Sequence, residues 1–206
     1  MGIRTSFNRR TATKVKDGRV QRKNRHTPTT HLGYIIDRES PGRGYRHVVT
    51  KRDIQTFLDL IPEWPALSQR LERIVLAARS DDLDGFAEFY YREGTGAIFL
   101  NAWSENLWVR LRRPYFDQHR FIFERFGLSF DLGNEAVECR FTDSQARAFV
   151  LLHIFMHELG HHRERLSKKH RTSCIGETYA ERFANRYLDV LYPAYVRVFG
   201  DPTRES

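Results

Sequence analysis

The sequence contains no run of about eighteen apolar residues, the length that a membrane-spanning helix needs. Its basic N-terminus also has no apolar segment of the kind found in secretory signals. Cysteine is equally scarce, since Cys139 and Cys174 are the only two and form no CxxC pair. These absences argue against a disulfide-stabilised scaffold, and we expect a cytoplasmic protein whose thiols stay reduced.

Acidic residues are nearly absent from the first 31 positions, which hold nine lysines or arginines and one acid, Asp17. The net charge of this segment, +8, equals that of the whole chain, because residues 32–206 carry twenty-five charges of each sign. Large apolar residues are few between Arg4 and Arg25, so burial cannot offset the entropy of ordering. We predict a disordered basic tail over residues 1–31, which either binds nucleic acid through its charge or is solvated without a partner.

Residues 32–206 contain no internal repeat and no second composition regime, and they predict one α+β domain. Apolar periodicity predicts helices over 51–61, 67–79 and 114–126, so that 32–80 form either part of this domain or a small helical subdomain. Short strands are expected over 33–36, 46–49, 86–91, 97–103, 107–111 and 135–141. The hairpin strand around 97–103 is a candidate edge strand for holding an extended peptide.

The segment from Met156 to His162 carries the pattern His-Glu-x-x-His. Positions i and i+4 share a helical face, so His157 and His161 can bind one metal ion, and Glu158 can take a proton from its water. Thr142, with a glutamine three residues on, predicts the start of a helix over 143–166 whose two histidines face the core. Gly160 beside them would permit the close approach of another segment.

A catalytic zinc site needs a third protein ligand, and the next predicted helix, over 175–191 and capped by Thr172 or Ser173, offers one. Glu177 falls on the apolar stripe of this helix, where a carboxylate is costly unless it meets a cation. Glu181, one turn later, can accept a hydrogen bond from the free nitrogen of a ligand histidine.

These residues resemble the gluzincin zinc peptidases, most closely the short-domain ImmA/IrrE family. That family combines HELGH with Glu-x-x-Ala-Asp/Asn-x-Phe/Trp-Ala on the next helix, and here the second segment is Glu-Thr-Tyr-Ala-Glu-Arg-Phe-Ala over 177–184. The resemblance covers about residues 142–192. It implies a zincin-like fold, in which the long HExxH helix and the following glutamate helix pack with a small twisted sheet. It also implies His157, His161 and Glu177 as Zn²⁺ ligands and Glu158 as general base, while Glu181 stands where the family has Asp or Asn.

For other residues near the motif, two roles are consistent with the sequence. His153, one turn before the motif, is either a polar group behind the ligands or a satisfied core histidine. Tyr179 and Tyr187 are candidate oxyanion stabilisers or packing residues, with packing favoured for Tyr187. His162 points about 100° away from His161 on a helix, and His170 belongs to a basic surface run, so neither is expected as a ligand.

Two functions are consistent with the sequence. The first is a zinc-dependent peptidase that acts on a peptide or protein substrate, with Glu158 activating the water. The alternative is a DNA-associated or regulatory protein whose basic tail, residues 1–31, binds nucleic acid and whose zinc site is structural or cleaves a bound partner.

Overall fold

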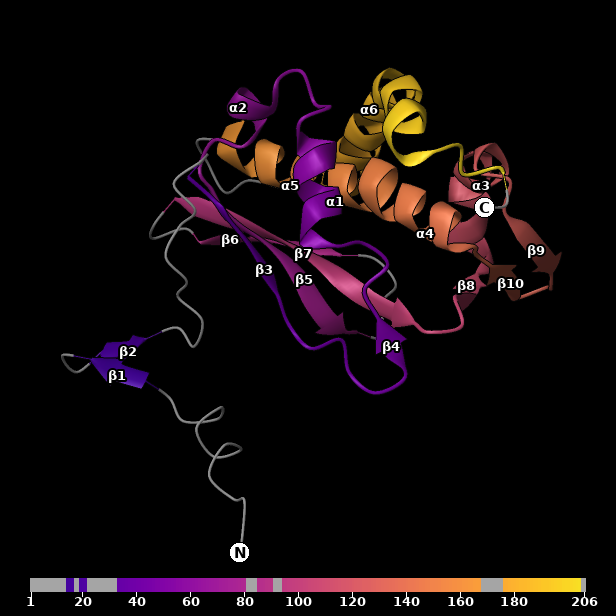
Figure 1. Cartoon of the computed structure of the whole chain (residues 1–206), viewed down its shortest axis with the longest axis horizontal. Coiled ribbons are helices and arrows are strands. Elements are labelled where there is room, and N and C mark those ends of the chain that lie inside the picture. Colours follow the sequence, from indigo (N-terminus) through magenta and orange to yellow (C-terminus); the bar gives the residue numbers. More distant parts are fainter. Residues whose placement is uncertain are drawn as a thin grey trace, which may run out of the picture.

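The computed structural model of the chain describes residues 14–16, 19–21, 33–80, 85–90, 94–167 and 176–204. The chain is α+β, with a layer of helices above one face of a five-stranded sheet (Figure 1). The strands of this sheet are β3 (Ile35–Arg38), β4 (Tyr45–Arg46), β5 (Leu71–Arg79), β6 (Phe86–Tyr90) and β7 (Thr95–Ser104). None of the helices in the described part of the chain is long and apolar enough to cross a bilayer.

Strand β7 is at the centre of this sheet. It runs parallel to β5 on one edge, and on its other edge it pairs antiparallel with β6 and with β4. Strand β3 extends the sheet by pairing parallel to β5, with Ile36 opposite Ile74. Residues before and after position 80 therefore share one sheet, and β6 forms its edge next to the helical layer.

A second sheet is small and wholly antiparallel, with the order β8 (Trp108–Arg112), β10 (Ala136–Arg140) and β9 (Ser129–Leu132). Helix α3 (Arg113–Arg125) follows β8 directly and ends before Gly127, whose φ of 69° lies in the left-handed region that favours glycine. The remaining helices are α1 (Lys51–Leu58), α2 (Trp64–Leu67), α4 (Asp143–Phe149), α5 (Phe155–Ser167) and α6 (Glu177–Phe199), with a π-helical turn, η1 (Val150–Ile154), between α4 and α5.

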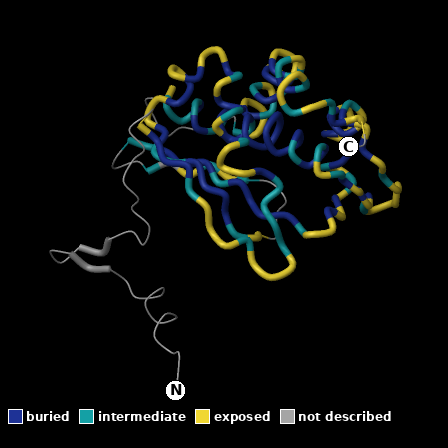
Figure 2. Tube along the Cα trace, viewed as in Figure 1, coloured by how far each residue is buried: buried dark blue, intermediate teal, exposed yellow. Residues whose placement is uncertain are grey.

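The core is one cluster to which both sheets and all the larger helices contribute. Figure 2 shows long buried stretches in the central strands and in the helix above them. Phe149 and Phe155, on either side of the π-helical turn, are fully buried, and α5 packs against β6 and β7. Cys139 also belongs to this core, and burial raises the pKa of its thiol to about 12. Cys174 lies outside the described residues.

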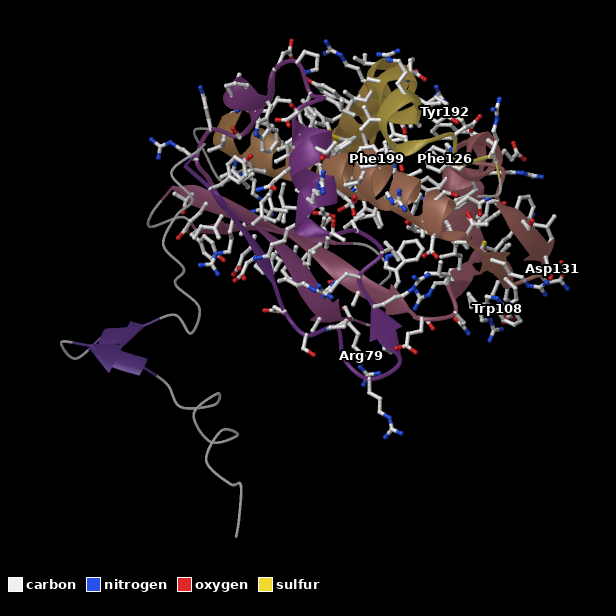
Figure 3. All side chains as sticks on the ribbon, in the orientation of Figure 1. Arg79, Trp108, Phe126, Asp131, Tyr192 and Phe199 are labelled. Atoms are coloured by element: carbon white, nitrogen blue, oxygen red, sulfur yellow. The ribbon has the colours of Figure 1, made fainter. Side chains whose placement is uncertain are left out.

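An aromatic contact connects the C-terminal end of α3 with α6. The rings of Phe126 and Tyr192 stack with centroids 6.1 Å apart, and Figure 3 shows both side chains between these helices. The guanidinium of Arg125 lies 4.5 Å from the centre of the Tyr192 ring and also pairs with Asp189 of α6. Helix α3 is therefore fixed relative to α6.

The helix predicted over 67–79 is wrong, because residues 71–79 form β5. Four consecutive residues of this strand, Ile74 to Ala77, are buried. A strand that is covered on both faces lacks the alternation of polar and apolar residues that marks a half-exposed strand. Its apolar residues matched a helical stripe by coincidence of spacing.

Smaller differences from the prediction concern single elements. Strand β9 was not predicted, and α6 begins at Glu177 after an N-cap glycine, Gly176, and continues through Pro193 to Phe199. The expected caps, Thr172 and Ser173, lie outside the described residues. In the predicted tail, β1 (Lys14–Lys16) and β2 (Arg19–Gln21) pair antiparallel, and an Asp-Gly dipeptide lies between them in the sequence. The rest of the tail is outside the described residues.

The capping box predicted at Thr142 is confirmed. The Thr142 hydroxyl accepts a hydrogen bond from the backbone N–H of Gln145 at 3.2 Å, and the Gln145 side chain accepts one from the Thr142 N–H at 2.9 Å. Two N–H groups at the start of α4 are thereby satisfied.

We expect Thr142→Ala to lower the free energy of unfolding by about 1 kcal/mol, because one of these N–H groups loses its acceptor. Thr142→Ser keeps the hydroxyl and should stay close to the wild type. Urea denaturation of the three proteins measures the difference, and equal stability of all three would show that the cap does not contribute.

Candidate metal centre

The predicted motif helix is present, but it contains a π-helical turn. Helices α4 and α5 are joined through η1, which ends at Ile154, two residues before Met156. Such turns insert one extra residue into a helix and occur often beside functional sites. The sequence carried no signal for this turn, because its five residues are good core residues in either kind of helix.

The structure brings His157, His161 and Glu177 together. The Nε2 atoms of the two histidines lie 3.1 Å apart. One carboxylate oxygen of Glu177 lies 3.2 Å from His157 Nε2, and the other lies 3.4 Å from His161 Nε2. These atoms come from one turn of α5 and from the first residue of α6, which packs on α5.

Each of these separations, two of which involve different oxygens of Glu177, is close to the spacing of neighbouring ligand atoms around a tetrahedral metal ion. With bonds of about 2.0–2.1 Å, two neighbouring ligand atoms of a tetrahedral zinc ion lie about 3.3 Å apart. Each of the three residues can offer a lone pair to a metal ion, the histidines through a deprotonated Nε2 and Glu177 through its carboxylate. One cation at their centre could therefore take a ligand atom from each of the three residues.

Glu177 reaches this cluster from a different environment than the sequence predicted. Its side chain is 81% exposed, so it does not lie on the apolar face of α6. That face is formed instead by buried residues such as Ala180 and Ala184. The expectation that the buried environment of Glu177 demands a cation is therefore wrong, although its carboxylate does meet both histidines.

Glu158 lies beside this cluster and is 5% exposed. It lines a cavity of about 510 Å³ together with the three converging residues. A Cβ atom at Gly85, the residue before β6, would lie 3.3 Å from Cγ of Glu158. The Glu158 side chain on α5 is thus close to the start of the edge strand β6.

Glu181 is more sheltered than Glu177, with 14% of its side chain exposed. Its Oε2 lies 3.3 Å from His157 Nδ1, as expected for a group that orients a ligand histidine. Burial alone raises the pKa of Glu181, but hydrogen bonds from His119 and His157 outweigh it and hold that pKa far below its usual value. For His157, burial lowers the pKa, while Glu181 and the neighbouring carboxylates raise it above its usual value.

Two further histidines approach Glu181. His153, a sequence candidate, is buried, and its Nε2 lies 3.9 Å from Glu181 Oε2. His119 of α3 was not predicted, although its Nε2 lies closer, at 3.5 Å from the same oxygen. The available signal was a histidine on the apolar stripe of α3, beside Phe116 and Phe123, but nothing in the sequence related that stripe to the motif.

The two tyrosine candidates do not line the cavity. Tyr179 is exposed and packs on Phe183 with ring centroids 6.3 Å apart, and Tyr187 donates a hydrogen bond to Glu63 at 2.7 Å. His162 is buried on another face of α5, with its Nε2 2.9 Å from the carbonyl oxygen of Gln69. His170 lies outside the described residues.

The cavity is lined by the start of the edge strand β6, by α3, and by η1 and α5. Its lining consists of Gly85, Phe86, Ala87, Tyr115, Gln118, His119, His153, Ile154, His157, Glu158, His161, Arg165 and Glu177. Phe86 is 47% exposed and stacks on Phe99 with ring centroids 4.4 Å apart, so it presents an apolar surface beside the polar cluster.

Comparison with known proteins identifies no relative. The sequence matches no protein-family model, no curated protein and no solved structure. The gluzincin resemblance of residues 142–192 is therefore a prediction that rests on the motif residues themselves.

Proposed function

We propose that this protein is a zinc-dependent peptidase with a zincin-like fold. The observation that carries the proposal is the convergence of His157 Nε2, His161 Nε2 and the Glu177 carboxylate at separations of 3.1 to 3.4 Å. Three protein ligands leave a fourth position for water, which is the ligand count of a catalytic zinc site and not of a closed structural one. Glu158, in the cavity beside these ligands, supports the same proposal.

When bound, zinc would supply a Lewis acid that polarises the scissile carbonyl and acidifies a water molecule. Glu158 would accept a proton as the water oxygen attacks the carbonyl carbon, and would deliver that proton to the nitrogen as the C–N bond breaks. Glu181 would keep the Nδ1 proton on His157, so that the Nε2 lone pair is available to the metal.

Strand β6 is the part of the sheet that could hold a substrate. The sequence placed this role on residues 97–103, but that strand, β7, is internal because β5 and β6 occupy its two edges. Among the described strands β6 pairs only with β7, and residues 85–87 line the cavity. A peptide paired with the other edge of β6 would be extended and would pass close to Glu158.

Metal analysis tests the proposal directly. We expect the protein, purified with zinc present, to contain about one zinc ion per chain. Replacing any ligand, as in His157→Ala, His161→Ala or Glu177→Ala, should remove most of the metal because two protein ligands remain. Elemental analysis after extensive dialysis gives the stoichiometry.

His47→Ala is a matched control, because His47 is a half-buried histidine whose Nε2 lies 3.0 Å from the carbonyl oxygen of Glu39 and which does not line the cavity. This variant should keep its zinc. A wild-type protein that holds no zinc, or that holds it equally well without the ligand side chains, would overturn the proposal.

A further inference from the structure

One oxygen atom in the interior is approached by three imidazoles. Glu181 Oε2 lies 3.3 Å from His157 Nδ1, 3.5 Å from His119 Nε2 and 3.9 Å from His153 Nε2. The other oxygen, Oε1, accepts a hydrogen bond from the Asn185 side chain at 3.2 Å. Both oxygens of this carboxylate are thus engaged, and their partners come from α3, η1, α5 and α6.

His119 is the contribution of α3, and its ring is held in place. It is 4% exposed, and its Nδ1 lies 2.8 Å from the carbonyl oxygen of Tyr115, one turn earlier. Because a carbonyl only accepts, Nδ1 carries a proton, and Nε2, which points to Glu181, donates to that carboxylate when both ring nitrogens are protonated. The Tyr115 ring packs against the imidazole with centroids 4.2 Å apart, and the Phe126–Tyr192 stack fixes α3 on α6.

A carboxylate that is largely removed from water is stable as an anion only when donors satisfy it. Of the two closest donors, His157 must keep its ring orientation if its other nitrogen is to face a metal ion. His119 has no such second task, since its Nδ1 is bound within its own helix. The imidazole of His119 can therefore hold the carboxylate still while His157 depends on it.

We propose that His119 is a positioning residue of the metal centre, which fixes Glu181 and through it the orientation and tautomer of His157. This inference rests on the proposed zinc site. It adds a link from α3, which lies outside the motif segments, to a ligand on α5. The chain of contacts runs from Tyr115 through His119 and Glu181 to His157.

The test is a double-mutant cycle on zinc affinity, measured by competition with a chromophoric chelator. We expect His119→Ala and Glu181→Ala each to weaken zinc binding by about 10- to 100-fold, the usual effect of losing a group that orients a ligand. The double variant should bind zinc no more weakly than Glu181→Ala alone, since His119 acts only through Glu181. His119→Gln, which can still donate to the carboxylate, should recover most of the affinity.

The absorption spectrum of bound Co²⁺ provides a readout that does not depend on activity. It should change in His119→Ala, because His157 is reoriented, and return towards that of the wild type in His119→Gln. Phe116→Leu is the matched control for a weakened α3. Phe116 is fully buried in the same helix and its ring packs on Phe123 and Phe130, so zinc affinity and spectrum should stay unchanged.

Several results would overturn the positioning role while leaving the zinc site standing. These are additive losses in the double variant, an unchanged affinity in His119→Ala, or two zinc ions per wild-type chain of which His119→Ala removes one. The last result would identify His119, His153 and Glu181 as ligands of a second ion, a set whose potential ligand atoms lie within 4.8 Å of one another. A wild-type chain that binds no zinc would instead overturn the proposed function.

Discussion

Glu158→Gln is expected to lower the rate of peptide hydrolysis by at least about 10²- to 10⁴-fold while leaving the zinc content unchanged. Glutamine keeps the size of the side chain and its place in the cavity, but it cannot accept a proton from water at neutral pH. The loss should fall on kcat, because proton transfer belongs to the chemical step and not to binding.

Glu164→Gln is the matched control for this variant. Glu164 is also a buried glutamate of α5, at 3% exposure, but it does not line the cavity. The substitution should leave the turnover rate near that of the wild type. Steady-state kinetics on a quenched fluorescent peptide library, with zinc measured on the same samples, separates the two variants. Full activity in Glu158→Gln would show that another residue acts as the base.

Local sequence signals predicted the elements that hold the site. The cap at Thr142, the start of α1 at Lys51 and the turn between β6 and β7 all follow from side chains near one another in the chain. The failure at β5 has the opposite origin. Side chains on both faces of β5 are buried from Ile74 to Ala77, and this depends on parts of the chain that are distant in sequence, which short-range periodicity does not reveal.

For the site residues too, local spacing was informative and the tertiary environment was not. His157 and His161 could be predicted because both lie on one helix, where the spacing fixes their geometry. The roles of the two glutamates were predicted, but the environment assigned to Glu177 belongs to Glu181: one is 81% exposed and the other 14%. Glu177 is the first residue of α6, at the exposed end of the helix. The predicted start at residue 175 placed it further inside the helix, where burial would be expected.

His119 could not have been connected with the motif from the sequence. It lies 38 residues before His157, on a helix between the first two strands of the small sheet, and only the packing of α3 against α6 brings it to Glu181. Contacts between side chains on separate helices depend on crossing angles and on which faces meet, and neither leaves a pattern in one sequence.

A second large effect is expected at Gly160, where α5 and α6 meet. A Cβ atom at this position would lie 2.9 Å from the Cα of Ala180 and 3.2 Å from the Cβ of Phe183. The close approach predicted for this glycine is therefore confirmed, and the neighbouring atom is backbone, which cannot rotate away. Any larger residue must push the two helices apart.

We expect Gly160→Val to lower the free energy of unfolding by about 3 kcal/mol, the upper range for overpacking a filled core. Valine has a higher helix propensity than glycine, but this gain is at most about 1 kcal/mol. The steric cost is larger, so the variant should be less stable than the wild type. In a domain of this size the loss corresponds to a fall in melting temperature of roughly 10 °C. Arg186→Val, at an exposed position of α6, is the control and should change stability by less than about 1 kcal/mol.

Gly160→Val also connects packing with the metal centre. Glu177 reaches the histidines only because α6 lies close to α5, and its carboxylate is 3.2 Å from His157 Nε2. Separating the helices should move this ligand away, so zinc affinity should fall even at temperatures where the variant is fully folded. Thermal denaturation followed with and without added zinc distinguishes the two effects, because the stabilisation by zinc should shrink together with the affinity. A variant with wild-type stability and zinc binding would show that the helices can relax around the added side chain.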